Sequence, residues 1–174
     1  MNLLIIGSGG REHAIAWKIS QSNKVKNIYV TPGNPGINLE EKVSLIEIDN
    51  PTIKDYIGIA KEKSIDLTIV GPEAPLVEGI VDEFNKNNLK IFGPNKLASQ
   101  LEGSKDFCKN ILNSGNVRTA KHRSFKESIS AIKYVKEQNM PIVIKADGLA
   151  AGKGVVIIDD RDKAYKLIND LFTG

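Results

Sequence analysis

The fold of this protein is decided at residues 3–14, which read LLIIGSGGREHA. Leu3–Ile6 is an apolar run with the length of a buried strand, and the glycines after it predict a tight loop. From Arg11 to Ser20 the sequence has the pattern of a helix. A strand, a glycine loop and a helix in this order predict the first unit of an α/β sheet.

The same alternation continues through the first hundred residues. A helix is predicted to begin with Asn50 as its N-cap and Pro51 in its first turn, and another to run from the Gly71-Pro72 turn as far as Phe84. Strands that alternate with helices at this interval predict right-handed βαβ units and an open parallel sheet with flanking helices. The other strands are predicted at residues 28–30, 43–48, 67–70 and 89–92.

The pattern changes after about residue 100. Two predicted strands are joined by a glycine-bearing loop without a helix between them, which predicts a hairpin. We therefore expect two domains, residues 1–120 and 121–174, and we predict that the second folds poorly alone because a small hairpin domain buries little apolar surface. The predicted strands here are 141–146 and 155–158, and the predicted helices 104–112, 129–136 and 161–171.

Composition is that of a soluble globular protein, with 41% hydrophobic and 26% charged residues among 174. The net charge of +3 (24 − 21) is small and scattered, which argues against a nucleic-acid partner. The first residues lack the features of a signal peptide or a membrane span, so a cytoplasmic location is expected. The single cysteine, Cys108, is interpreted as a packing residue.

The loop Gly7-Ser8-Gly9-Gly10 has the properties of a phosphate-binding loop. Glycines let the backbone approach an anion, and the helix that follows offers free N–H groups. A dinucleotide site is disfavoured, because Glu12 stands where that motif needs its third glycine and the second strand ends in Val30-Thr31 without an acid. A purely structural turn stays open as an alternative.

Small polar residues and glycines also follow the other predicted strands. Ligands of open parallel sheets bind beyond the carboxyl ends of the strands. The groups there are Pro32-Gly33-Asn34, Gly71-Pro72-Glu73 and Gly93-Pro94-Asn95. They suit a sugar phosphate, although Glu73 can equally be a helix-start acid, Arg11 can equally form an ion pair, and His13 can equally be a packing or capping residue.

A second group of candidate residues lies in the predicted hairpin. Lys145 ends an apolar strand, and the loop Gly148–Gly154 carries a second lysine, Lys153. Backbone N–H groups and ammonium groups placed in this way can neutralise a triphosphate. The loop is not a Walker A motif, because Gly154 follows the lysine where Ser or Thr is needed, and an ordinary hairpin with exposed lysines stays open.

Five segments resemble, in order and spacing, the glycinamide ribonucleotide synthetase family of ATP-grasp ligases. Other ATP-grasp enzymes share the architecture, but the Gly9–Ala14 start and the Gly71–Val77 block favour this family. The five segments are residues 7–14, 32–34, 66–77, 101–105 and 141–155.

The resemblance implies a preATP-grasp domain at residues 1–120, followed by the start of an ATP-grasp region with its lid. It implies that ATP phosphorylates glycine and that 5-phosphoribosylamine attacks the glycyl phosphate, giving glycinamide ribonucleotide in purine biosynthesis. Catalysis then rests on positioning and charge neutralisation, with no covalent nucleophile. The resemblance also implies Mg²⁺ or Mn²⁺ as a cofactor, with its ligands outside this chain.

The resemblance further implies two groups of site residues. Those on the phosphoribosylamine side are Gly9, Gly10, Arg11, Glu12, Pro32, Gly33, Asn34, Gly71, Pro72 and Glu73. Those facing the ATP phosphates are Lys105, Lys145, Asp147, Gly148, Gly152, Lys153 and Gly154.

Members of this family are more than twice as long, so we expect the chain to be the N-terminal portion of such an enzyme. Two alternatives stay open. The chain alone can be a non-catalytic module that binds a phosphoribosyl group, or its parent can be an ATP-grasp carboxylate–amine ligase with another acceptor. The oligomeric state is left open.

Overall fold

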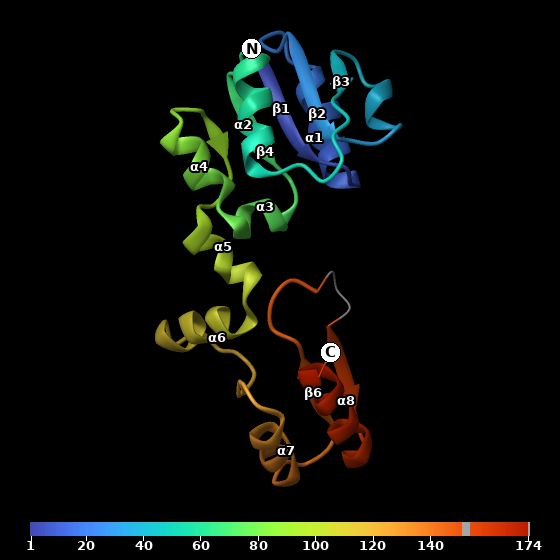
Figure 1. Cartoon of the computed structure of the whole chain (residues 1–174), viewed down its shortest axis with the longest axis vertical. Coiled ribbons are helices and arrows are strands. Elements are labelled where there is room, and N and C mark those ends of the chain that lie inside the picture. Colours follow the sequence, from blue (N-terminus) through green and yellow to red (C-terminus); the bar gives the residue numbers. More distant parts are fainter. Residues whose placement is uncertain (151–153, 174) are drawn as a thin grey trace. The chain divides into compact units, whose positions relative to one another are not determined.

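The computed structural model describes residues 1–150 and 154–173. The chain divides into two compact units, Met1–Gln100 and Leu101–Gly174. Figure 1 shows the first unit in blue to yellow-green and the second in yellow to red.

The first unit is built on a five-stranded sheet in which every pair of neighbouring strands is parallel. The strand order is β3-β2-β1-β4-β5, so β1 lies at the centre and the order reverses between β1 and β4. The strands are β1 (Asn2–Gly7), β2 (Asn27–Pro32), β3 (Val43–Leu45), β4 (Leu67–Val70) and β5 (Ile91–Phe92).

Helices cover both faces of this sheet (Figure 1). Successive side chains of a strand point to opposite faces, and β1 feeds two separate cores. Leu4 and Ile6 pack in one core with residues of the helices α2 to α4, whereas Leu3 and Ile5 pack in another with Ala16 of α1. The helices are α1 (Gly10–Ser20), η1 (Ile37–Leu39), α2 (Ile53–Glu62), α3 (Glu73–Glu78), α4 (Ile80–Lys86) and α5 (Lys96–Gly103).

Three local features of the helices differ from the sequence-based expectation, and β3 covers only half of the strand predicted at residues 43–48. The helix predicted as far as Phe84 is split at Gly79, whose φ of 104° ends α3 and begins α4. Thr52, rather than Asn50, is the N-cap of α2, because its hydroxyl and the Asp55 carboxylate form a reciprocal capping box. The helix α5 was not predicted.

The second unit is a small antiparallel hairpin with three helices. Ile142, Ile144 and Ile158 of the hairpin pack toward Ala164 and Ile168 in one small core, while Val143, Val155 and Ile157 are exposed. The elements are α6 (Lys105–Ser114), α7 (Ser128–Lys136), β6 (Ile142–Lys145), β7 (Val155–Ile158) and α8 (Arg161–Thr173).

The predicted fold class is confirmed for the first unit, and the predicted hairpin is confirmed for the second. The two units divide at Gln100, before the domain boundary expected at residue 120. The domain boundary at residue 120 stays a prediction. Among the helices that the structure describes, none has the length and hydrophobicity needed to cross a membrane.

Candidate functional site

A cavity of about 430 Å³ opens at the carboxyl ends of β1 and β4. This is the point where the strand order reverses, and open α/β sheets bind their ligands at such a point. The lining residues come from the ends of β1 and β2, the loops after β1 and β4, the first turns of α1 and α3, and α2. They are Ile6, Gly7, Ser8, Gly9, Gly10, Arg11, Glu12, Pro32, Tyr56, Pro72 and Glu73.

The glycine loop after β1 forms one wall of this cavity. Gly7 has a φ of 129°, a conformation that side chains disfavour, and α1 begins three residues later. The N–H groups of Gly10 and Arg11 lie in the first turn, where a helix has no internal acceptors, and no hydrogen bond between described residues uses them. They are available to an anion.

Glu12 lies under the loop and is only 5% exposed. Its Oε2 accepts a hydrogen bond of 2.7 Å from the Gly9 N–H. A Cβ at Gly71 would lie 1.9 Å from Glu12 Oε1. The carboxylate therefore occupies the space that a side chain at Gly71 would need.

Arg11 in the first turn of α1 and Glu73 at the start of α3 both line the cavity. The Arg11 guanidinium donates to the Gly71 carbonyl oxygen, and its Nη1 lies 4.0 Å from Glu73 Oε2. The two side chains are 64% and 46% exposed, so the pair is weak. The ion pair with Glu73 therefore does little to keep the Arg11 side chain from turning toward a bound anion.

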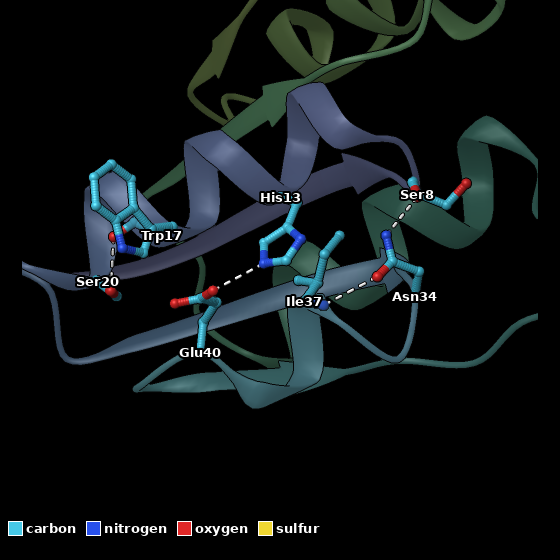
Figure 2. Close-up of polar contacts among 7 residues, drawn as sticks. All are labelled: Ser8, His13, Trp17, Ser20, Asn34, Ile37 and Glu40. Carbon is cyan, nitrogen blue, oxygen red and sulfur yellow. Dashed lines mark hydrogen bonds and ion pairs between the residues drawn. The ribbon is translucent and has the colours of Figure 1, made fainter.

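Asn34 connects two loops. Its Nδ2 donates to the Ser8 carbonyl oxygen at 2.7 Å, and its Oδ1 accepts from the Ile37 N–H at 3.0 Å (Figure 2). It is not one of the residues that line the cavity. Its neighbour Gly33 has a φ of 69° and donates its N–H to the Gly7 carbonyl oxygen.

The structure thus brings most of the first predicted group of site residues together at the cavity. Gly33, Asn34 and Gly71 contact the lining residues without being among them. Whether any of these residues contacts a ligand stays a prediction. The predicted residues that line the cavity are Gly9, Gly10, Arg11, Glu12, Pro32, Pro72 and Glu73.

Tyr56 is a lining residue that the sequence analysis missed. It lies in α2 at a helical spacing of apolar residues, and its ring packs in a core. Burial, with the charges of Glu78 and Asp55, raises the pKa of its phenol. The group is therefore neutral, and a neutral phenol can donate a hydrogen bond. No sequence signal separated it from an ordinary core tyrosine.

His13 lies outside the cavity lining. Its Nε2 is 2.8 Å from Glu40 Oε1, and Figure 2 shows this contact joining α1 to the end of η1. The packing alternative for His13 is consistent with this arrangement.

The second group of predicted residues centres on Asp147. Its Oδ1 accepts from the backbone N–H of Lys105 at 2.6 Å and of Asp106 at 3.3 Å, and its Oδ2 accepts from the Ser104 hydroxyl at 3.0 Å. Partial burial opposes ionisation, but these hydrogen bonds and one from the Gly148 N–H together lower the pKa of Asp147. The carboxylate therefore caps α6.

Lys105 is tied to the same point, because its Nζ donates to the Gly148 carbonyl oxygen at 2.7 Å. Lys145 is exposed at the end of β6, and Gly154 directly precedes β7. Gly152 and Lys153 lie outside the described residues. Of the predicted ATP-facing group, Lys105, Asp147 and Gly148 are in contact.

Two further features concern metal binding and the single thiol. Within residues 1–150 and 154–173, no group of three or more His, Cys, Asp or Glu side chains could hold a metal ion. Cys108 is a free, half-buried thiol on α6.

Family models match the chain from end to end. The model described as "Phosphoribosylglycinamide synthetase, N domain" matches residues 1–102, and the one described as "Phosphoribosylglycinamide synthetase, ATP-grasp (A) domain" matches residues 103–174. The matched regions meet close to the division between the two compact units.

Curated relatives are similar along the whole chain. The phosphoribosylamine–glycine ligases of Vibrio cholerae and Pasteurella multocida are 52% and 49% identical over 174 residues, which is 100% of this chain and 41% of each relative. The chain thus spans about two fifths of the length of the curated relatives it matches.

Solved structures show the same relationship. The phosphoribosylamine–glycine ligase of Thermotoga maritima is 29% identical, with a TM-score of 0.74 over 100% of this chain and 41% of its own. The biotin carboxylase domain of the Hydrogenobacter thermophilus 2-oxoglutarate carboxylase has a TM-score of 0.77 over 99% of this chain and 40% of its own. Its identity of 14% shows a shared fold only.

Proposed function

This chain belongs to the phosphoribosylglycinamide synthetase family, and on that basis we propose that it is part of an enzyme that joins glycine to 5-phosphoribosylamine with ATP. The products are glycinamide ribonucleotide, ADP and phosphate. In this proposal the first unit binds the phosphorylated ribosylamine, and the second contributes to the ATP site.

The observation that carries the proposal is the cavity beside the N-terminus of α1. The N–H groups of Gly10 and Arg11, the helix dipole and the Arg11 guanidinium offer complementary charge to a 5-phosphate. The Glu73 carboxylate also lines the cavity and can accept hydrogen bonds from ribose hydroxyls or an amine. A ligand that is anionic at one end and rich in donors at the other fits this arrangement.

The proposed reaction has two steps. The γ-phosphoryl group of ATP passes to a carboxylate oxygen of glycine, and ADP leaves. The amine nitrogen of phosphoribosylamine then attacks the acyl carbon, the C–O bond to phosphate breaks, and the nitrogen loses its proton. Activation is needed because a carboxylate is a poor electrophile.

The second unit supports the ATP side of the proposal. Lys105 and Lys145 carry ammonium groups that can neutralise phosphate charge, and Asp147 fixes the backbone on which Lys105 stands. The resemblance implies Mg²⁺ or Mn²⁺, but the carboxylates in the described part of this unit do not form a metal-binding group. The roles proposed here therefore rest on the chain's own side chains and amides.

The direct test measures binding of ribose 5-phosphate to the 174-residue chain by calorimetry. We expect Arg11→Ala to weaken binding about tenfold or more, since a hydrogen bond from a charged donor contributes roughly 1.5–3 kcal/mol. Lys18→Ala is the matched control, because Lys18 is exposed on the same helix and outside the cavity. If the wild-type chain and Arg11→Ala bound ribose 5-phosphate with equal affinity, the proposed phosphate site would be ruled out.

A second candidate function is a non-catalytic phosphoribosyl-binding module, favoured by a cavity lined entirely by the first unit. ADP release is measured with ATP, magnesium, glycine and phosphoribosylamine, each omitted in turn. Turnover that needs all four supports ligation by the chain. Binding without turnover, while a longer protein containing this chain is active, supports the module. Turnover with another amine in place of phosphoribosylamine supports a ligase with a different acceptor.

A further inference from the structure

The peptide group between Ser8 and Gly9 is held from both of its ends by side chains. Its carbonyl oxygen accepts from Asn34 Nδ2 at 2.7 Å, and its N–H donates to Glu12 Oε2 at 2.7 Å. A trans peptide is planar, with its C=O and N–H pointing in opposite directions. Two hydrogen bonds of this kind fix the rotation of the peptide plane.

The neighbouring peptide is held as well. The Gly7 carbonyl oxygen accepts from the Gly33 N–H at 3.1 Å. Asn34 is itself anchored, because its Oδ1 accepts from the Ile37 N–H at 3.0 Å. Figure 2 shows the Asn34 amide between Ser8 and Ile37. A side chain fixed at both ends of its amide is a rigid support for the glycine loop.

We propose that Asn34 and Glu12 are positioning residues that clamp the Ser8–Gly9 peptide, so that the N–H groups of Gly10 and Arg11 are aimed at the cavity before a ligand arrives. The Gly9 N–H donates to Glu12 and is therefore not available to the anion. This inference rests on the proposed function for its ligand, but the clamp itself is a property of the free protein.

The physical reason for such a clamp is the freedom of glycine. Gly9 and Gly10 have no side chains to restrict their φ and ψ angles, so an unsupported loop would sample many conformations. Ordering it at the moment of binding would reduce affinity. Asn34 and Glu12 supply the order in advance, which is the arrangement that makes binding sites effective.

The test begins with the ligand-free chain. Amide hydrogen exchange is measured by NMR after ¹⁵N-glycine labelling. Asn34→Ala is expected to raise exchange at Gly9 by about fivefold, the equivalent of one ordinary hydrogen bond, with little change in the melting temperature. Asn38→Ala is the matched control, since Asn38 lies in η1 of the same segment and is exposed.

The second readout is binding of ribose 5-phosphate. Asn34→Ala is expected to weaken it about fivefold. Glu12→Gln retains an oxygen that can accept from the Gly9 N–H, so it should preserve the slow exchange at Gly9, whereas Glu12→Ala should raise that exchange. If Glu12 acts on the ligand through its charge, Glu12→Gln will lose as much affinity as Glu12→Ala.

Two results would overturn the clamp. One is unchanged exchange at Gly9 in Asn34→Ala. The other is lost affinity with an undisturbed free loop, which would make Asn34 a direct ligand contact. If the variants alter exchange as expected while the wild-type chain binds no ribose 5-phosphate, the clamp stands and the proposed function fails.

Discussion

Gly71 shows how a missing side chain shapes the candidate site. An added Cβ would lie 1.9 Å from Glu12 Oε1 and 2.4 Å from its Cδ, far inside any contact distance. The backbone of Gly71 is not in the left-handed region, so space alone requires the glycine. Its carbonyl oxygen also accepts from Arg11, and this hydrogen bond joins α1 to the loop after β4.

Gly71→Ala is expected to displace the Glu12 carboxylate and to reduce the free energy of unfolding by about 1–3 kcal/mol, as overpacking does. Affinity for ribose 5-phosphate should fall with it. The measurement is urea unfolding followed by the fluorescence of Trp17.

Gly58→Ala is the matched control for this substitution. Gly58 lies inside α2, and nothing is found within 4 Å of an added Cβ. Alanine should there stabilise the protein by roughly 0.5–1 kcal/mol. If Gly71→Ala were as stable as Gly58→Ala, Glu12 could not be packed as described.

The sequence predicted the glycine loop and most of the cavity residues, because strand ends and glycines are local signals. It did not predict that Asn34 supports the loop, since that depends on where Ser8 and Ile37 lie in space. It also did not identify Tyr56 as a cavity residue, because this tyrosine packs in the core and lines the cavity at the same time.

At the scale of elements, the N-terminus of α6 depends on a side chain more than forty residues away in sequence. Asp147 accepts from two backbone N–H groups of α6 and from the Ser104 hydroxyl. A carboxylate at this end of a helix also interacts favourably with the helix dipole. The loop after β6 is thereby attached to α6.

This attachment predicts a dependence of stability on pH. The pKa of Asp147 is lowered in the folded chain, so its stabilising contribution is complete above the unfolded value of about 3.9. It is lost as the pH falls through the lowered folded pKa. Asp147→Asn should therefore be less stable than the wild-type chain at pH 7, and the difference should shrink in acid.

The measurement is urea unfolding followed by circular dichroism at several pH values. Asp159→Asn is the control, because Asp159 is exposed beside Asp160, which receives the hydrogen bond from Lys163 at the start of α8. A difference between wild-type and Asp147→Asn that stays constant down to about pH 3 would contradict the assignment.

Element predictions succeeded where the apolar pattern was regular and failed where a local contact decided the outcome. β1, β4 and β7 lie where the pattern placed them. The N-cap of α2 moved to Thr52 because a reciprocal pair with Asp55 outweighs the favourable residue type of Asn50. α3 and α4 are separate because Gly79 has a positive φ, which the apolar pattern does not reveal.

At the scale of the whole molecule, the two units differ in how much apolar surface they bury. The first has two clusters that contain ten and seven buried hydrophobic residues, whereas the cluster in the described part of the second contains five. Small cores give small stability. We therefore keep the prediction that the region beyond residue 120 folds poorly alone.

Limited proteolysis tests this expectation. Cleavage should begin beyond residue 120 and leave a resistant N-terminal fragment, which mass spectrometry identifies. Ribose 5-phosphate should protect that fragment further, since its ligand cavity lies in the first unit. No preferential cleavage beyond residue 120 would contradict the prediction and favour two units of similar stability.

The hairpin described above has one more consequence, for the behaviour of the chain in concentrated solution. β6 and β7 pair only with each other in the described part of the second unit, so each presents an outer row of backbone N–H and C=O groups. The exposed side chains of Val143, Val155 and Ile157 lie on the same two strands. Open strand edges next to apolar side chains recruit further strands, so we expect the hairpin to be a place where chains of this protein associate and aggregate.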